Sequence, residues 1–301
     1  MQKPELEIKP VTLSDKPILD RYFSQYGGFN SEFTFTNMFM WQKSYNIRYA
    51  ITNDMLCIFS KHGDGAETVN IPLGNGDMKA AISTLLDYFK SVGQPPLIRL
   101  YKEDEKNLLN SLFPNTFVFT EDRNSYDYVY NVQDLIDLPG SRYHAKRNHI
   151  NRLLANHSFE YKPIDEALKK SCFDLFVTWC ESKRDTVPGI DEQHEAVKCL
   201  FDNMDTLSVK GGCILIDGQV VAFSFGEALN AEKSIAVIHL EHADANIQGS
   251  FPLINQQFLE NEWSEFELVN REEDMGLSGL RRAKKSYHPC MMVKKYIASV
   301  I

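Results

Sequence analysis

Hydrophobic and polar positions in this 301-residue chain switch repeatedly between a period of two and a period of about 3.6. A period of two predicts strands, and apolar residues three and four apart predict amphipathic helices. In the first half, strands are expected at 6–11, 46–52, 55–61, 67–73, 97–101, 116–120 and 125–131. Helices are expected at 14–25, at 31–43, through Ala81–Phe89 and at 103–113.

The second half repeats this plan. Its strands are expected at 159–164, on both sides of Asp217-Gly218, and at 234–243, 266–270 and 291–298. Its helices are expected at 141–157, from Asp165 onward, through Val197–Met204, at 250–262 and at 278–287. The Asp-Gly pair lies between two apolar runs, which is a strong hairpin signal.

Apart from the last strand of the first half and the helix 141–157, which connects the halves, each half has the order β-α-α-β-β-β-α-β-α-β, which predicts an α/β chain with mixed sheets. This order is similar to that of the GNAT acyltransferase fold, in which three antiparallel strands precede a long helix and crossover connections follow it. We expect two tandem GNAT-like domains, at 1–140 and 141–301. The first should be degenerate and structural, because the residues suited to chemistry lie in the second.

Composition narrows the class of protein. The formal net charge of −9 argues against broad, non-specific nucleic-acid binding. The six cysteines form no CxxC pair and no Cys/His zinc spacing, so we expect free thiols and no metal site. The N-terminal segment has no apolar signal core, and no apolar run approaches the ~18–20 residues that span a bilayer. We expect a soluble, cytoplasmic protein, and the sequence does not determine its oligomeric state.

Positive charge is concentrated in two stretches that contain no acidic residue: 141–157 with four Lys or Arg, and 276–301 with six. Helical spacing predicts that basic faces at 142–152 and 278–287 flank one cleft and contact tRNA or anionic phospholipid headgroups. Solvated helices or a surface salt-bridge network are the alternatives. Arg147 could form a buried ion pair. The expected buried stripes are Tyr143, Ile150 and Leu154 in the first helix, and Leu280, Ala283 and Tyr287 in the second, with Ser278 as its cap.

Three segments carry a family resemblance: KRNHINRL (146–153), HLEHADANIQGSFPLIN (239–255) and VNREEDMGLSGLRRAKKSYHP (269–289). The chain resembles a bacterial family related to the C-terminal domain of lysyl-phosphatidylglycerol synthases, and it is also similar to Fem-type peptidyltransferases. The resemblance implies tandem GNAT-like domains. It also implies acyl or aminoacyl transfer from an activated donor, either aminoacyl-tRNA or a coenzyme A thioester.

The loop 246–251 precedes a predicted helix, where unpaired amides and the helix dipole attract anions. CoA-dependent GNAT enzymes usually have Q/R-x-x-G-x-G/A here. Gly249 fits the central glycine, but Asn246 and Phe251 do not fit the flanking positions, which puts tight CoA binding in doubt. The expected donor-binding residues of this loop are Asn246, Gln248, Gly249 and Ser250. The alternative is an ordinary helix start capped by Ser250.

The turn after the strand 266–270 should border a cleft, because ligands gather beyond the C-terminal ends of strands in α/β sheets. Arg271 could hold a phosphate or carboxylate there with two hydrogen bonds. The alternative is a solvated turn that caps the next helix. The expected donor-binding residues of this region are Asn270, Arg271, Arg281, Lys284 and Lys285.

Attack on an ester or thioester requires a base for the nucleophile's proton and donors for the oxyanion. Among Glu227, Glu241 and Asp244, we choose Glu241 as the base, and Tyr287 as the acid for the leaving group. A structural ion pair between Glu241 and a nearby Arg is the alternative.

Simple alternation along 234–243 places His239 and Glu241 on one face of the strand, with Leu240 and His242 on the other. The two histidines then project in opposite directions and cannot share a metal ion.

The sequence therefore predicts an acyl- or aminoacyltransferase that passes its group to an amine or hydroxyl by direct attack, without a covalent enzyme intermediate. The acceptor is a small molecule or a lipid. Two rivals remain: an N-acyltransferase that uses acyl-CoA, and a non-catalytic binder of RNA or anionic phospholipid headgroups.

Overall fold

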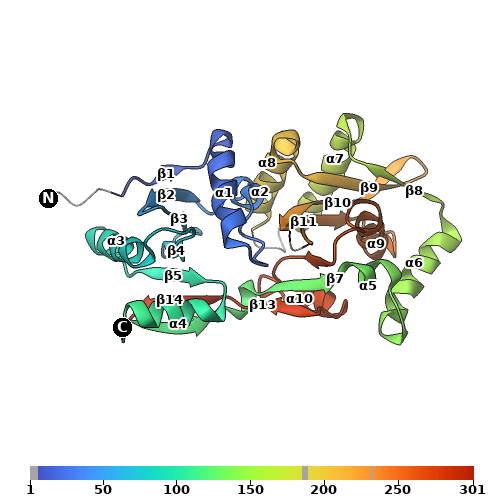
Figure 1. The fold of residues 1–301 in the computed structure, drawn as a ribbon. Coiled ribbons are helices and arrows are strands. Elements are labelled where there is room, and N and C mark those ends of the chain that lie inside the picture. Colours follow the sequence, from blue (N-terminus) through green and yellow to red (C-terminus); the bar gives the residue numbers. More distant parts are fainter. Residues whose placement is uncertain (1–5, 185–188, 231, 233) are drawn as a thin grey trace. The chain divides into compact units, whose positions relative to one another are not determined.

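The computed structural model describes residues 6–184, 189–230, 232 and 234–301 (Figure 1). None of the helices in this part of the chain is long and apolar enough to cross a membrane. The chain divides into two compact units, one comprising residues up to Tyr126 together with Val293–Ile301, and the other Asp127–Met292. This division falls before residue 140, where the sequence placed the boundary, and the C-terminal segment belongs to the first unit.

The first unit contains the helices and strands expected for the first half, except the strand at 125–131, which lies in the second unit, and several are shorter. The strand expected at 6–11 is reduced to 9–10, and the helix at 31–43 to 35–40. Its strands are β1 (Lys9–Pro10), β2 (Arg48–Thr52), β3 (Met55–Ser60), β4 (Thr68–Asn70), β5 (Leu97–Leu100), β6 (Phe117–Glu121) and β14 (Tyr296–Val300). Its helices are η1 (Leu13–Asp15), α1 (Lys16–Tyr26), α2 (Phe35–Met40), α3 (Met78–Ser91), α4 (Glu103–Leu112) and η2 (Arg123–Ser125).

The second unit also follows the expected order, with one added helix, α5, directly after β7. Its strands are β7 (Asp127–Asn131), β8 (Phe159–Pro163), β9 (Lys210–Ile216), β10 (Gln219–Asn230), β11 (Ile235–Ala243), β12 (Leu268–Asn270) and β13 (Met291–Val293). Its helices are α5 (Val132–Asp137), η3 (Ser141–Tyr143), α6 (His144–Asn156), α7 (Glu166–Lys183), α8 (Ile190–Leu207), α9 (Ser250–Glu262) and α10 (Ser278–Lys285).

Corresponding strands occupy the same positions in the two sheets, and each sheet includes one strand from the other half of the chain. The first sheet runs β1-β2-β3-β4-β5-β14-β6, and the second runs β8-β9-β10-β11-β12-β7-β13. The sixth position of the first sheet is thus filled by the C-terminal strand β14, seen in red among the blue-green elements of Figure 1. The sixth position of the second sheet is filled by β7. The single strand expected at 291–298 is two strands, one in each sheet.

A buried ion pair anchors β14 in the first unit. Lys295 is 2% exposed, and its Nζ donates to Glu32 Oε1 at 2.8 Å. Arg99 Nη2 donates to the same oxygen at 2.8 Å. Burial raises the pKa of Glu32, but the two cations outweigh this effect and lower it to about 2. These ion pairs therefore fix Lys295, which precedes β14, in addition to the pairing of β14 with its neighbouring strands.

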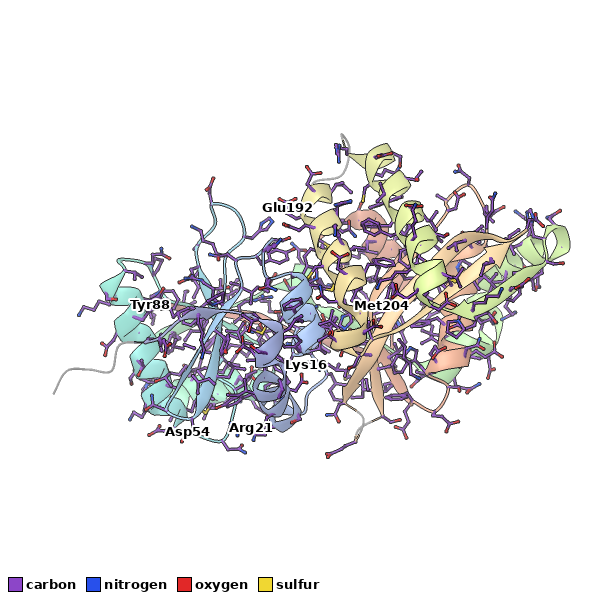
Figure 2. All side chains as sticks on the ribbon, turned by 90° about the horizontal axis from the view of Figure 1, so that it is seen from above. Lys16, Arg21, Asp54, Tyr88, Glu192 and Met204 are labelled. Atoms are coloured by element: carbon purple, nitrogen blue, oxygen red, sulfur yellow. The ribbon has the colours of Figure 1, made fainter. Side chains whose placement is uncertain are left out.

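Helices cover both faces of the second sheet. One face carries α9, with α5 and α6 packed on it, around a core that includes Ile150, Leu153 and Phe258. The opposite face carries α7 and α8, where Phe201 contacts Phe223 and Phe225 with ring centroids 5.6 and 4.9 Å apart. Glu192 and Met204, labelled in Figure 2, show the direction of α8 from its first turn to its last.

Candidate active site

The candidate site lies where β11 and β12 separate. These parallel strands pair only between Ile235–Val237 and Leu268–Asn270. Beyond this point β11 continues to Ala243 along β10 alone, while the chain leaves β12 at Asn270 and turns. Side chains from the free stretch of β11 and from this turn therefore meet at the opening in the sheet.

A β-bulge in β11 decides which side chains face this opening. Phe225 pairs with Leu240 and Gly226 with Ile238, so His239 has no partner in the ladder. Ala236, Ile238 and Ala243 all belong to the core beneath α9, which requires the side-chain alternation to change between 238 and 243. His239 and Glu241 consequently lie on opposite faces of the sheet. The prediction that they share a face was wrong, because strict alternation cannot anticipate a bulge.

Glu241 is held in a nearly buried ion pair. Its Oε1 accepts from Arg271 Nη2 at 2.8 Å, and its Oε2 accepts from Asn255 Nδ2 at 3.1 Å. The two charged side chains are only 12% and 10% exposed. Removing one partner of such a pair typically costs about 3–5 kcal/mol, because the other charge stays buried alone. Glu241 is thus placed to orient Arg271.

Arg271 is enclosed by aromatic rings and retains one unsatisfied donor. Its guanidinium lies 4.8 Å from the ring centre of Tyr287 and 5.7 Å from that of Tyr130. Its Nη1 is buried and has no hydrogen-bond partner within the described residues. A buried cationic donor left unpaired is costly unless a ligand supplies the acceptor. Arg271 Nη1 is therefore a buried N–H group without an acceptor, beside the point where β11 and β12 separate.

Lys146 is the residue of this cluster that the sequence did not select as a site residue. It lies on α6, which packs through Ile150 and Leu153, and its Nζ is 3.7 Å from the ring centre of Tyr287. Burial and then the charge of Arg271 lower the pKa of Lys146 to about 8, although Glu241 opposes this. A lysine with such a pKa is partly neutral near pH 7 and can accept a proton.

The structure brings both predicted catalytic residues to this cluster. Glu241 contacts Arg271, and Tyr287 is 6% exposed beside the same guanidinium. Burial raises the pKa of Tyr287, and Arg271 partly opposes this shift. The phenol is therefore protonated at neutral pH.

The loop before α9 departs from the expected arrangement. The amide of Ser250 donates to the Ile247 carbonyl at 3.1 Å, and the Ser250 hydroxyl donates to the Asp244 carbonyl at 2.9 Å. The expectation of an unpaired amide at Ser250 was therefore wrong. The remaining side chains are tied down: Asn246 donates to Asp244, while Gln248 accepts from Arg152 and contacts His149. The loop is packed against α6 and closed by local hydrogen bonds.

Gly249 is required at its position for close packing. Its φ is +104°, and a Cβ there would lie 2.4 Å from the His149 carbonyl oxygen of α6. We expect Gly249→Ala to lower the free energy of unfolding by about 1–3 kcal/mol, from overpacking and backbone strain. Urea denaturation followed by circular dichroism measures this change.

The matched control for this prediction is Gly279→Ala in α10. No atom lies within 4 Å of a Cβ built at Gly279, whose φ is not positive. This substitution should be neutral or stabilise by up to ~1 kcal/mol, because alanine favours helix. Equal effects of the two substitutions would contradict the packing described for Gly249.

The turn after β12 is held by polar contacts from within the protein. Asn270, fully buried, donates to Asp127 at 2.9 Å and accepts from the amide of Glu272 at 2.7 Å. Arg281 donates twice to Asp274 at 2.8 Å. Lys284 donates to the carbonyls of Arg271 and Glu273. These predicted donor-binding residues therefore position the turn that carries Arg271, whereas Lys285 remains exposed.

Several predictions about the two basic helices need correction. Leu154, expected in the buried stripe of α6, is 45% exposed, and Leu153 is buried instead. Ala283 of α10 is exposed, and the N-cap of that helix is Leu277 rather than Ser278. Arg147 donates to the carbonyls of Leu138 and Gly140 at the end of α5.

The η3 turn before α6 nevertheless contacts the segment that follows α10. Tyr143 donates through its hydroxyl to the Tyr287 carbonyl at 3.0 Å, and His288 Nε2 lies 3.2 Å from the Arg142 carbonyl oxygen. Arg142 in η3 is exposed and donates to Asp134 at 2.8 Å, and Lys285 is exposed at the end of α10. We call the exposed cations Arg142, Arg282 and Lys285 the basic surface.

Residues 23–299 match the family model described as "Phosphatidylglycerol lysyltransferase, C-terminal". A crystal structure of a conserved protein of unknown function from Bacteroides thetaiotaomicron is 31% identical with a TM-score of 0.91, covering 99% of this chain and 100% of the other. An uncharacterized protein from Mycoplasmoides gallisepticum is 25% identical over 181 residues. That match spans 59% of this chain and only 57% of the relative's length.

More distant structures identify the fold. The structure of L-PGS from Bacillus licheniformis has a TM-score of 0.64 at 15% identity, covering 94% of this chain and 91% of the other. A tandem GNAT protein from the clavulanic acid biosynthesis pathway has a TM-score of 0.54 at 8% identity, covering 98% of both chains. The predicted tandem GNAT-like architecture is confirmed.

Proposed function

Because the chain belongs to the family of phosphatidylglycerol lysyltransferase C-terminal domains, we propose that it transfers an aminoacyl group from an aminoacyl-tRNA to the hydroxyl of a lipid acceptor. The family model covers most of the chain and includes all of the candidate site. The acceptor that we propose is an anionic phospholipid such as phosphatidylglycerol. Both substrates are assigned here from the family description and from the chemistry of the site.

The observation that carries this proposal is the unpaired Nη1 group of Arg271 beside Lys146 and Tyr287, at the point where β11 and β12 separate. Transfer of an acyl group from an ester needs a donor for the developing oxyanion and a base for the attacking hydroxyl. Arg271, largely buried, and Lys146, half-buried, supply these two functions where water is partly excluded and their interactions are strong.

The proposed reaction is a direct displacement. Neutral Lys146 removes the proton from the acceptor hydroxyl as its oxygen attacks the carbonyl carbon of the aminoacyl ester. Arg271 donates from Nη1 to the oxyanion of the tetrahedral intermediate. The C–O bond to the ribose of the donor then breaks, and the ribose oxygen takes the proton from the Lys146 ammonium. Glu241 serves as a positioning residue in this scheme, since its carboxylate is occupied by Arg271 and Asn255.

The loop before α9 favours an aminoacyl ester over a coenzyme A thioester. A pyrophosphate at this turn would need exposed amides, whereas the Ser250 amide is bonded to Ile247 and Gly249 is covered by α6. The phosphates of a tRNA have another place to bind, because the basic surface lies at the junction of α6 and α10. Arg282 and Lys285 would supply a salt-dependent contribution to affinity, whereas Arg142 is paired with Asp134.

The test is transfer with isolated components. The purified chain is incubated with a labelled aminoacyl-tRNA pool and vesicles of phosphatidylglycerol, and lipid products are identified by mass spectrometry. We expect an aminoacylated lipid, and no product from acetyl- or acyl-CoA. Product from CoA thioesters alone would contradict the donor assignment.

A charge-reversal variant tests the role of the basic surface in binding tRNA. Charge reversal of Arg282 and Lys285 should raise the KM for tRNA at 150 mM salt and reduce the salt dependence of binding. Binding of tRNA with no transfer under any condition would identify a non-catalytic RNA binder instead.

A further inference from the structure

A second charged cluster lies on the opposite face of the sheet, immediately behind the candidate site. The imidazole of His239 is completely buried, and each of its nitrogens contacts a carboxylate. Nε2 lies 2.8 Å from Glu227 Oε1 on β10, and Nδ1 lies 2.9 Å from Glu272 Oε1 in the turn after β12. An imidazole can donate from both nitrogens only when it is protonated.

Local backbone irregularities position both His239 and Glu272 in this cluster. His239 is the bulged residue of β11, and its side chain lies on the same face as Glu227. Glu272 has φ +58°, a left-handed conformation that costs free energy for a residue with a side chain. The amide of Glu272 is held by Asn270 at 2.7 Å, and its carbonyl accepts from Tyr128 at 3.2 Å. Such a conformation persists where surrounding contacts fix it, and the contact with His239 is one of them.

Glu272 directly follows Arg271, so its placement affects the candidate site. Arg271 points toward Glu241 on one face of the sheet, while Glu272 points toward His239 on the other. The turn is thereby attached to β11 on both faces at successive residues. If the Glu272 contact were lost, the turn would keep its contacts with Arg281 and Lys284 but would no longer be attached to β11 on this face, so Arg271 would be held less firmly.

We propose that His239, as an imidazolium between Glu227 and Glu272, is a positioning residue that latches the turn 271–274 onto β11 and so holds Arg271 in the opening between β11 and β12. The latch itself is a property of the fold. Its effect on transfer rests on the proposed function.

The latch depends on pH in a defined direction. The charged groups that face the imidazole are Glu227 on β10 and Glu272 in the turn, whereas Arg271 and Lys284 are engaged with Glu241 and with backbone carbonyls. Burial lowers the pKa of His239, but the two carboxylates outweigh it and raise the value to about 9. Because the folded pKa exceeds the unfolded value of about 6.5, the stabilisation is complete below pH 6.5 and is lost as pH rises through about 9.

The experiment is hydrogen exchange of the amides of 271–277, measured by mass spectrometry and corrected for intrinsic rates. His239→Gln keeps one hydrogen-bond donor but no charge, and should accelerate this exchange at least tenfold at pH 7. His242→Gln is the matched control. His242 is equally buried on the same strand, but it packs against Phe176 and Trp179, and burial lowers its pKa to about 4. It should leave exchange of 271–277 within twofold of wild type.

Two further measurements keep the proposal testable if His239→Gln does not fold. Glu272→Asn tolerates the left-handed backbone but is too short to reach His239, and it should also accelerate exchange of the turn. In the wild-type protein, nitrogen chemical shifts of His239 at pH 7 should report protons on both ring nitrogens. A neutral imidazole at pH 7, or unchanged exchange in either variant, would overturn the latch.

Transfer kinetics separate this inference from the proposed function. With a loosened turn, kcat should fall at least tenfold while the KM for tRNA stays within twofold. If the turn loosens but the wild-type protein transfers nothing, the latch stands and the proposed function fails. If the wild-type protein transfers and both variants retain its kcat, the latch plays no part in positioning.

Discussion

Arg271→Lys is expected to lower kcat for aminoacyl transfer by about 10²–10³, the loss typical of removing one oxyanion donor. Lysine keeps the positive charge against Glu241 but cannot bond that carboxylate and present a second N–H group from one planar fork. The protein should remain folded, because no buried charge is left unpaired. Rates from single-turnover reactions with saturating lipid vesicles measure this effect.

Two control variants separate chemistry from stability. Arg184→Lys makes the same change at an exposed site in the second unit, where the arginine side chain is 61% exposed, and should change kcat less than twofold. The double variant Arg271→Met/Glu241→Met removes the buried pair together, so it should retain a cooperative thermal transition and lose activity. Wild-type kcat in Arg271→Lys would remove Arg271 from the reaction.

We expect activity to rise with pH, because Lys146 must be neutral to act as the base. Because its pKa is lowered to about 8, the neutral amine increases about tenfold per pH unit below that value and levels off above it. We expect kcat/KM to follow the same curve between pH 6 and about 8.5, below the pH at which His239 loses its proton. Lys146→Arg should reduce kcat/KM at pH 7 by about 10²–10³ and abolish the rise, because a guanidinium stays protonated throughout this range.

The control for this prediction is Lys162→Arg on β8, where the lysine side chain is 49% exposed. It should retain both the rate and the pH profile of the wild type. Spontaneous hydrolysis of the donor ester is measured at each pH without protein and subtracted. A wild-type profile that is flat from pH 6 to 9 would exclude Lys146 as the base.

The sequence predicted the order of elements well, because that order depends on local periodicity and turn residues. Asp165 and Asp77 cap the helices that follow them, accepting from the amides of Leu168 and Ala80. The exchange of β7 and β14 between sheets was not predictable in this way. Strand partners depend on contacts between distant segments, and the run 291–298 gives no local sign that it divides between two sheets.

The candidate site was predicted in part. Glu241, Tyr287 and Arg271 were identified from chemistry and from their place near strand ends, and they lie together. Lys146 was recognised only as one of several cations on a basic helix, because its burial against Tyr287 is a tertiary effect. The bulge at His239 changed the alternation of the residues that follow it, so Glu241 faces away from His239, and an extra residue in a strand leaves no mark in the alternation pattern.

The most direct test is a crystal structure with a non-hydrolysable analogue, in which an amide replaces the ester between the amino acid and the terminal adenosine of a tRNA. The account predicts that the carbonyl oxygen of the analogue lies about 3 Å from Arg271 Nη1, with Lys146 on the side from which the acceptor attacks. An analogue bound away from the opening between β11 and β12, with Arg271 Nη1 still unpaired, would contradict it.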